Sequence, residues 1–150
     1  MYLADTNAIS ELRKGAKADR GLVQFLRAHE GELFLPVQVV GELVQGIERL
    51  RNRNDTVQAA RLEAWLLTVV EDFEARILPF DLACAEAWGR LMGAKNQNPI
   101  DRQIAAVAIV YDLTIVTRNI GDFEGTGARL VNPFWADQNP GASGPRLVQP

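Results

Sequence analysis

The chain has 150 residues, of which 47% are hydrophobic, with one cysteine and a formal net charge of −3. This composition suffices for the core of one domain without disulfide bonds, and the acidic balance gives no global signal for nucleic-acid binding. No apolar run approaches the ~18 residues of a membrane-spanning helix, and no signal-peptide pattern precedes Asp5. We therefore expect a cytoplasmic protein with no membrane partner, in which Cys84 is a small core residue of a helix.

Strand-like and helix-like hydrophobic patterns alternate along the chain. The first half predicts a strand at 1–5, helices at 7–14 and 19–30, a strand at 33–36, and helices at 37–53 and 56–73. The second half predicts a strand at 76–80, helices at 81–95 and 98–112, a strand at 113–117, a turn-rich loop at 118–127 and a strand at 128–132. The alternation favours the α/β class, as a three-layer α/β/α sandwich around a mainly parallel sheet.

Helix start signals and the C-terminal composition refine this organisation. Asp81 is typical of an N-cap, and Asn98 followed by Pro99 predicts a cap and a first helical residue. Residues 136–150 contain three prolines and few large apolar side chains. We expect one domain over residues 1–135, followed by a mobile tail.

Acidic side chains from separated parts of the chain are predicted to meet at one edge of the sheet. Asp5 ends the first strand, and Asp122 follows the next-to-last strand. Asp101 lies in the first turn of the preceding helix, and Glu42 lies in the second turn of the helix that follows the second strand. Ligands of such sheets bind outside the carboxyl ends of the strands, so this edge is the candidate site.

Each acid also has an ordinary structural explanation when it is taken alone. Asp5 or Asn7 can cap the first helix, and Asp101 in a first turn gains from the helix dipole. Glu42 fits a surface position beside an apolar stripe, and Asp122 fits a loop. The predicted convergence of all four favours a shared function over these separate explanations.

Carboxylates gathered at one edge repel each other unless a cation lies among them. Oxygen ligands alone indicate a hard cation, Mg²⁺ or Mn²⁺, whereas zinc is disfavoured because His29 and Cys84 have no partners at ligand spacing. Such an ion acidifies a water and polarises an anionic oxygen, which suits hydrolysis of a phosphodiester. Three residues are then candidates for positioning the phosphate or the water, although strand-end and turn chemistry also explains them: Thr117, Arg118 and Asn119.

The helix that carries Glu42 has two further features with open explanations. Gly41 and Gly46 leave room beside Glu42, either for an ion or for close packing of another helix. The helix ends in a basic strip, which forms either a positive surface or simply a solvated helix end: Arg49, Arg51 and Arg53.

Four stretches, in this order, resemble the PIN-domain nucleases, in particular the VapC-type toxins of bacterial type II toxin–antitoxin pairs: "YLADTNAISEL", "LPVQVVGELVQGI", "NPIDRQIAAVAIVYDLTIVTRNIGDF" and "NPF". The resemblance implies an acidic site of Asp5, Glu42 and Asp101. Its fourth position varies among relatives, and here Asn119 directly follows "TR" while the acid is Asp122. We favour Asp122 as the fourth acid, with Asn119 and Thr117 assisting.

The resemblance also implies an activity and partners. These are Mg²⁺-dependent endoribonuclease activity, a homodimer, and neutralisation by a cognate antitoxin that inserts near the active site. The basic strip, together with Arg118, would contact the RNA backbone or the antitoxin's acidic groups.

Two alternative functions follow from the same residues. A strand that ends in aspartate also begins the aspartyl-phosphate phosphatases, in which the aspartate is a nucleophile. However, "DTN" lacks the second acid two residues later that the haloacid-dehalogenase pattern expects. A non-catalytic PIN-like binding module is the other alternative, and the presence of Asp5, Glu42 and Asp101 counts against it.

Overall fold

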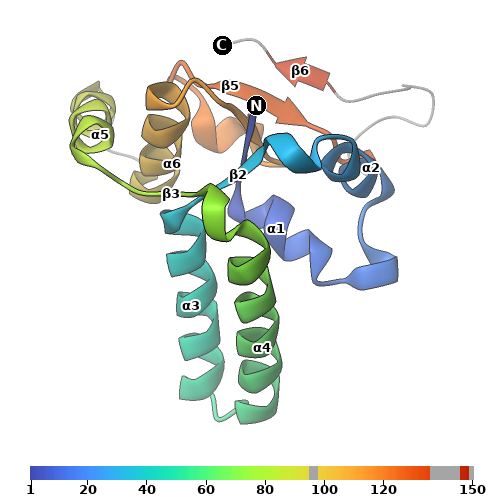
Figure 1. Ribbon diagram of the computed structural model, residues 1–150. Coiled ribbons are helices and arrows are strands. Elements are labelled where there is room, and N and C mark those ends of the chain that lie inside the picture. Colours follow the sequence, from blue (N-terminus) through green and yellow to red (C-terminus); the bar gives the residue numbers. More distant parts are fainter. Residues whose placement is uncertain (95–97, 136–145, 149–150) are drawn as a thin grey trace.

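The computed structural model describes residues 1–94, 98–135 and 146–148 (Figure 1). Its strands are β1 (Tyr2–Ala4), β2 (Leu33–Pro36), β3 (Ile77–Leu78), β4 (Thr114–Val116), β5 (Arg129–Asn132) and β6 (Arg146–Val148). Its α-helices are α1 (Thr6–Leu12), α2 (Arg20–Ala28), α3 (Val37–Asn52), α4 (Thr56–Phe73), α5 (Leu82–Ala94) and α6 (Pro99–Val110). Short 3-10 turns complete the description: η1 (Gly15–Lys17), η2 (Glu30–Glu32), η3 (Glu74–Arg76) and η4 (Ile120–Phe123).

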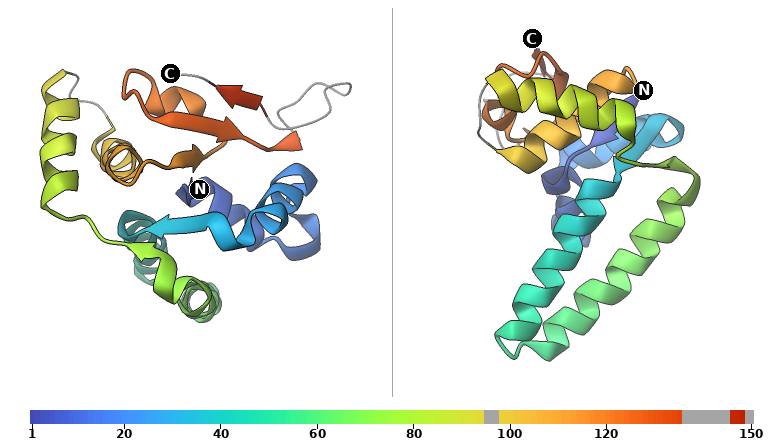
Figure 2. Two further views of the ribbon diagram at one scale, coloured as in Figure 1. Left: turned by 45° about the horizontal axis from the view of Figure 1, so that its top comes forward. Right: turned by 90° about the vertical axis from the view of Figure 1, so that its left-hand side faces the viewer.

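The strands form one sheet in the order β3-β2-β1-β4-β5-β6, in which β6 alone is antiparallel to its neighbour. The chain proceeds outward from β1 to β3, so right-handed crossovers place α1 to α4 on one face. It then returns from β3 to β4 through α5 and α6, which lie on the other face. The left view of Figure 2 shows α1 and α2 in blue opposite α5 and α6 in yellow and orange. The predicted three-layer fold with a mainly parallel sheet is therefore confirmed.

The core explains why these short strands are stable. Leu3, Ile115 and Val116 are fully buried in β1 and β4, where helices cover both faces and an apolar run without alternation is expected. Cys84 is fully buried on α5, as predicted. A search of the described residues found no helix long and apolar enough to cross a membrane.

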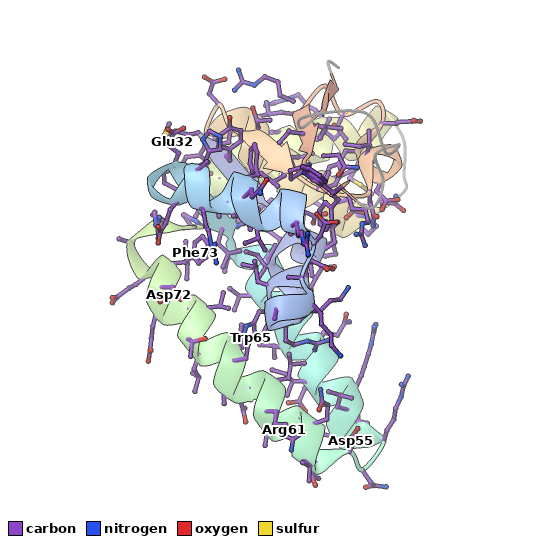
Figure 3. The ribbon with its side chains drawn as sticks, turned by 90° about the vertical axis from the view of Figure 1, so that its right-hand side faces the viewer. Glu32, Asp55, Arg61, Trp65, Asp72 and Phe73 are labelled. Carbon is purple, nitrogen blue, oxygen red and sulfur yellow. The ribbon has the colours of Figure 1, made fainter. Side chains whose placement is uncertain are left out.

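Helices α3 and α4 form an antiparallel hairpin that extends away from the sheet (Figures 1 and 2). Leu43 and Ile47 of α3 and Leu62 and Leu66 of α4 are buried at four-residue spacing, which closes the hairpin by apolar packing. Figure 3 shows α4 running from Asp55 at the tip, past Trp65, to Phe73 near the sheet. The basic strip lies toward the tip, not beside the sheet.

The segment after β5 is fixed against the start of α2. A Cβ on Gly21 would lie 1.6 Å from Cδ1 of Trp135, so only glycine permits this approach. The Trp135 backbone N–H donates to Asp19 Oδ1 at 2.9 Å, and the same carboxylate oxygen caps α2. This contact ties the end of the predicted domain to its N-terminal third.

Some local predictions differ from the structure. Asn98 stands at the N-cap position of α6 in the left-handed conformation (φ 47°), but its side chain makes no capping hydrogen bond. The strand predicted at 76–80 is reduced to β3, because η3 precedes it and Pro79 follows it. β6 was not predicted, and the rest of the expected tail, 136–145 and 149–150, lies outside the described residues. Asp81 does cap α5, accepting from the Cys84 N–H at 2.9 Å, as predicted.

Candidate active site

The site lies where the sheet changes its direction of winding. β1 pairs with β4 in parallel, with Ala4 opposite Val116, so the next residue of each strand, Asp5 and Thr117, leaves the sheet at the same edge. Crossovers depart in opposite directions from these two strands, and open α/β sheets bind their ligands at the carboxyl ends of such strands. Asp5 donates its N–H to the Val116 carbonyl at 3.1 Å, which extends the ladder to the site.

Asp5 is only 5% exposed, and its carboxylate accepts three hydrogen bonds. Its Oδ1 accepts from the Thr6 N–H at 2.7 Å, which caps α1. Its Oδ2 accepts from Asn7 Nδ2 at 2.6 Å and from Thr117 Oγ1 at 2.8 Å. Each carboxylate oxygen has two acceptor positions, so these hydrogen bonds fill both positions of Oδ2 and leave one on Oδ1. Asp5 is thus both a helix cap and a carboxylate with a defined open position.

Thr117 and Asn7 form a saturated brace behind Asp5. The Thr117 hydroxyl is fully buried, donates to Asp5, and accepts from Asn7 Nδ2 at 2.9 Å and from the Asn119 N–H at 3.0 Å. Asn7 Oδ1 accepts from the Arg118 N–H at 2.9 Å. A hydroxyl with one donor and two acceptors in use has no capacity for substrate. The structure therefore places Thr117 as a positioning residue, not as a group that can touch phosphate or water.

Glu42, Asp101 and Asp122 lie close enough to Asp5 to interact electrostatically. Thr6 Oγ1 donates to Glu42 Oε2, which connects α1 to α3 at this edge. Burial, followed by the charges of Asp5, Asp122 and Glu42 in that order of size, raises the pKa of Asp101 to about 6. Burial also raises the pKa of Asp5, with smaller contributions from Glu42 and Asp122, against lowering by its hydrogen bonds. Asp101 thus lies within electrostatic range of the other three predicted acids, and Asp5 within range of Glu42 and Asp122.

The chemistry of the donors fits a hard divalent cation. The pKa values of the Asp5 and Asp101 carboxyls are raised by burial and by neighbouring carboxylates, and a cation would neutralise the charge that these groups hold. Across the described ranges, no three histidine, cysteine, aspartate or glutamate side chains converge closely enough to enclose an ion by themselves. Mg²⁺ is commonly bound by one or two carboxylates while it retains several waters. Asp5 Oδ1 and the Asp101 carboxylate suit this arrangement.

The remaining predicted site residues occupy different places. The Asn119 side chain is exposed, and its N–H donates to Thr117; Asp122, in η4, accepts from Asn98 Nδ2 at 3.5 Å. The Arg118 guanidinium lies 4.2 Å from the centre of the Phe134 ring, a cation–π contact at the margin of the site.

The basic strip is separated from the acids along α3. Arg51 pairs with Glu48 and, at 2.7 Å, with Glu63 of α4. Arg49 and Arg53 are exposed on the same end of the helix. From Glu42 to Arg51 the helix rises about 13 Å at 1.5 Å per residue, so these arginines are not part of the acidic cluster.

The sequence analysis gave Asn7 only a capping role and gave Thr6 no role, and here it was incomplete. Thr6 orients Glu42, and Asn7 joins Asp5, Thr117 and the Arg118 backbone. Their position directly after the strand-ending Asp5 was the available signal. Gln38, buried one turn before Glu42, was also missed, because its helical spacing from Glu42 is informative only once the two residues are seen to share a cavity.

The fold and the acidic edge of the sheet define the class of protein. The model of the PIN domain matches residues 2–127, and the chain therefore belongs to the PIN-domain family. This confirms the resemblance noted from the sequence motifs.

Individual relatives are similar over nearly the whole chain. VapC ribonuclease Y4jK of Sinorhizobium fredii is 33% identical over 141 residues, which cover 89% of this chain and 98% of that protein. Toxin FitB of Neisseria gonorrhoeae is 32% identical over 143 residues, 91% of this chain and all of that protein. Among solved structures, FitAcB from Neisseria gonorrhoeae superposes with a TM-score of 0.70 at 29% identity, covering 89% of this chain and 98% of that chain.

Proposed function

We propose that the protein is an endoribonuclease that requires Mg²⁺, or Mn²⁺, and that it is the toxin of a toxin–antitoxin pair. The observation that carries the proposal is that two carboxyls at the switch point of the sheet, Asp5 and Asp101, have raised pKa values, with the charge of Asp5 contributing to the shift of Asp101. Similarity to a VapC ribonuclease and to toxin FitB supports the substrate class and the biological role.

The chain's own residues divide the work at this site. A divalent cation bound there would acidify a water and polarise a phosphate oxygen. Asp5 Oδ1 and the Asp101 carboxylate would hold it, while Asn7 and Thr117 fix the orientation of Asp5. Thr6 orients the Glu42 carboxylate, which can accept a hydrogen bond from water. Asp122, as the fourth acid, and the exposed Asn119 would bind further waters or substrate hydroxyls.

Cleavage of RNA by the purified protein is the test. We expect hydrolysis of a mixed single-stranded RNA pool with Mg²⁺ or Mn²⁺ and none with EDTA. In Asp5→Asn and Asp101→Asn the cleavage rate should fall by at least about 100-fold, which is more than the loss usually caused by replacing a residue that only hydrogen-bonds to a metal ligand. Arg27→Gln, exposed on α2, is the matched control. Absence of cleavage by the wild type, or full activity of both variants, would refute the nuclease. Covalent phosphate on Asp5 would indicate a phosphatase instead.

The partners are proposed on separate grounds. Val57 and Leu67 of α4 are 64% and 60% exposed, and Leu82 of α5 is 76% exposed, so apolar surface is available for an antitoxin and for a second subunit. Arg49 and Arg53, with Arg51 and Arg118, would contact RNA phosphates or acidic groups of the antitoxin. Light scattering with and without the product of the adjacent reading frame tests the homodimer and the complex; a monomer that binds no such product would refute both. We place this activity in the cytoplasm.

A further inference from the structure

A pocket of about 270 Å³ opens beside Glu42, between α3 and α6. Three of its lining residues carry amide side chains, and one is charged. The lining residues are Gln38, Gly41, Glu42, Gln45, Ile100 and Gln103. Gln38, Glu42 and Gln45 recur at four- and three-residue steps, so they share one face of α3. Because Glu42 belongs both to this lining and to the acidic cluster, the pocket adjoins the place where a scissile phosphate would bind.

Gln38 is the buried polar side chain of this pocket. It is only 9% exposed, and its Oε1 has no hydrogen-bond partner among the described residues. Its Nε2 donates to Gln103 Oε1 at 3.5 Å, the outer limit of a hydrogen bond. A buried amide oxygen without a partner is unfavourable. Rotation about the last torsion of glutamine, which is broad, would present this oxygen to an N–H donor in the pocket.

Gly41 accounts for the opening of the pocket. A Cβ built at this position would meet none of the described atoms within 4 Å. Close helix packing, one of the two explanations considered from the sequence, is therefore not the reason for glycine here. Glycine disfavours a helix interior, and the space that it leaves is part of the pocket.

We propose that this pocket binds the base of a nucleotide next to the scissile phosphate of single-stranded RNA, through N–H donors on the edge of the base. The proposal rests on the ribonuclease function proposed above. Neutral amides match base edges, whereas the one charged lining residue, Glu42, would repel phosphate. The volume falls below the range for drug-sized ligands, which suits one base. Ile100, 39% exposed, offers an apolar contact to the base.

Cleavage of defined RNA tests the subsite. Four series of short single-stranded RNA are compared. They are identical except that each series has a different base next to one cleavage position, on its 5′ or its 3′ side. The kcat/KM of each series is measured with Mn²⁺. We expect the wild type to prefer one base, and Gln38→Met and Gln103→Met to reduce this preference about tenfold. Gly41→Leu, which fills the pocket and favours the helix, should reduce it similarly. Gln24→Met on the exposed face of α2 is the matched control and should retain the preference.

The outcomes separate this inference from the nuclease proposal. Equal cleavage of all four series by the wild type would overturn the subsite and leave the ribonuclease standing. An unchanged base preference in Gln103→Met and Gly41→Leu would also overturn the subsite and leave the ribonuclease standing. This outcome does not depend on whether Gln38→Met folds, which circular dichroism checks. No cleavage in any series would overturn both proposals. Loss of preference in the pocket variants, with turnover of the least favoured series maintained, would support the subsite.

Discussion

Charged side chains at the acidic edge and at the tip of the α3–α4 hairpin are held in opposite ways. Asp5 is buried among other carboxylates and is braced by Thr6, Asn7 and Thr117. Arg51 lies in the open, where it pairs with Glu48 and Glu63, and this pairing raises its pKa. Like charges that share a buried site destabilise the fold, whereas opposite charges in water contribute little. The arrangement at the edge therefore costs stability, whereas the tip is a solvated surface with exposed ion pairs.

Outside the acids themselves, we expect the largest effect at the brace behind Asp5. Thr117→Val removes the donor to Asp5, leaves the Asn119 N–H without its acceptor and leaves Asn7 Nδ2 with only its hydrogen bond to Asp5. Unfolding free energy should fall by about 1–3 kcal/mol, and RNA cleavage by about 10- to 100-fold. Urea denaturation and cleavage rates measure both. Thr117→Ser keeps the hydroxyl and should retain most activity; equal losses in the two variants would contradict this role.

Cation affinity at the edge should depend on pH. Asp101 has a pKa of about 6, so protons compete with the cation for its carboxylate as pH falls. We expect the affinity for Mn²⁺ to fall by about tenfold per pH unit below pH 6 and to level off above it, as measured by titration calorimetry. In Asp101→Asn the affinity should be weak and its dependence on pH flatter. An affinity in the wild type that does not change between pH 5 and 7 would contradict the assignment.

Without a divalent cation, the same carboxyl should weaken the fold as pH rises. Its pKa is raised from an ordinary value of 3.8 to about 6, so the folded state favours the protonated form. This contribution is present below pH 4 and is lost as pH rises through 6. Because half-exposed groups are screened, we expect about 1 kcal/mol, or about 2–4 °C in melting temperature.

Thermal melts in EDTA at pH 4 and pH 7 measure this loss. Asp101→Asn should lose less stability than the wild type over this range, and parallel behaviour of the two proteins would contradict the prediction.

The hairpin tip should give the smallest effect. Arg51→Ala removes the exposed pairs with Glu48 and Glu63. We expect the melting temperature to change by less than about 3 °C, and less still in 0.5 M salt, because exposed ion pairs are weak and screened. Calorimetry of the variant and of Arg53→Ala measures this. A larger loss in Arg51→Ala alone would mean that the tip is structurally important.

Local pattern was sufficient for much of the fold and for the acids. The helical spacing of Val39, Leu43 and Ile47 predicts α3, and a buried strand ending at Asp5 predicts the edge. Asp5, Glu42, Asp101 and Asp122 follow from the rule that parallel strands end together. These features depend on hydrophobic periodicity and on the right-handed crossover between parallel strands, and both can be predicted from short stretches of sequence.

Only the tertiary structure decided what the neighbours of these acids do. Asn7 and Thr117 stand 110 residues apart in sequence, and their hydrogen bond exists because β1 and β4 pair in register. The pocket between α3 and α6 likewise depends on two helix faces that meet only in the fold. The sequence by itself determined the elements and the charges at their ends. Packing determined which polar atoms are satisfied, because a hydrogen bond requires partners that only the folded chain brings within reach.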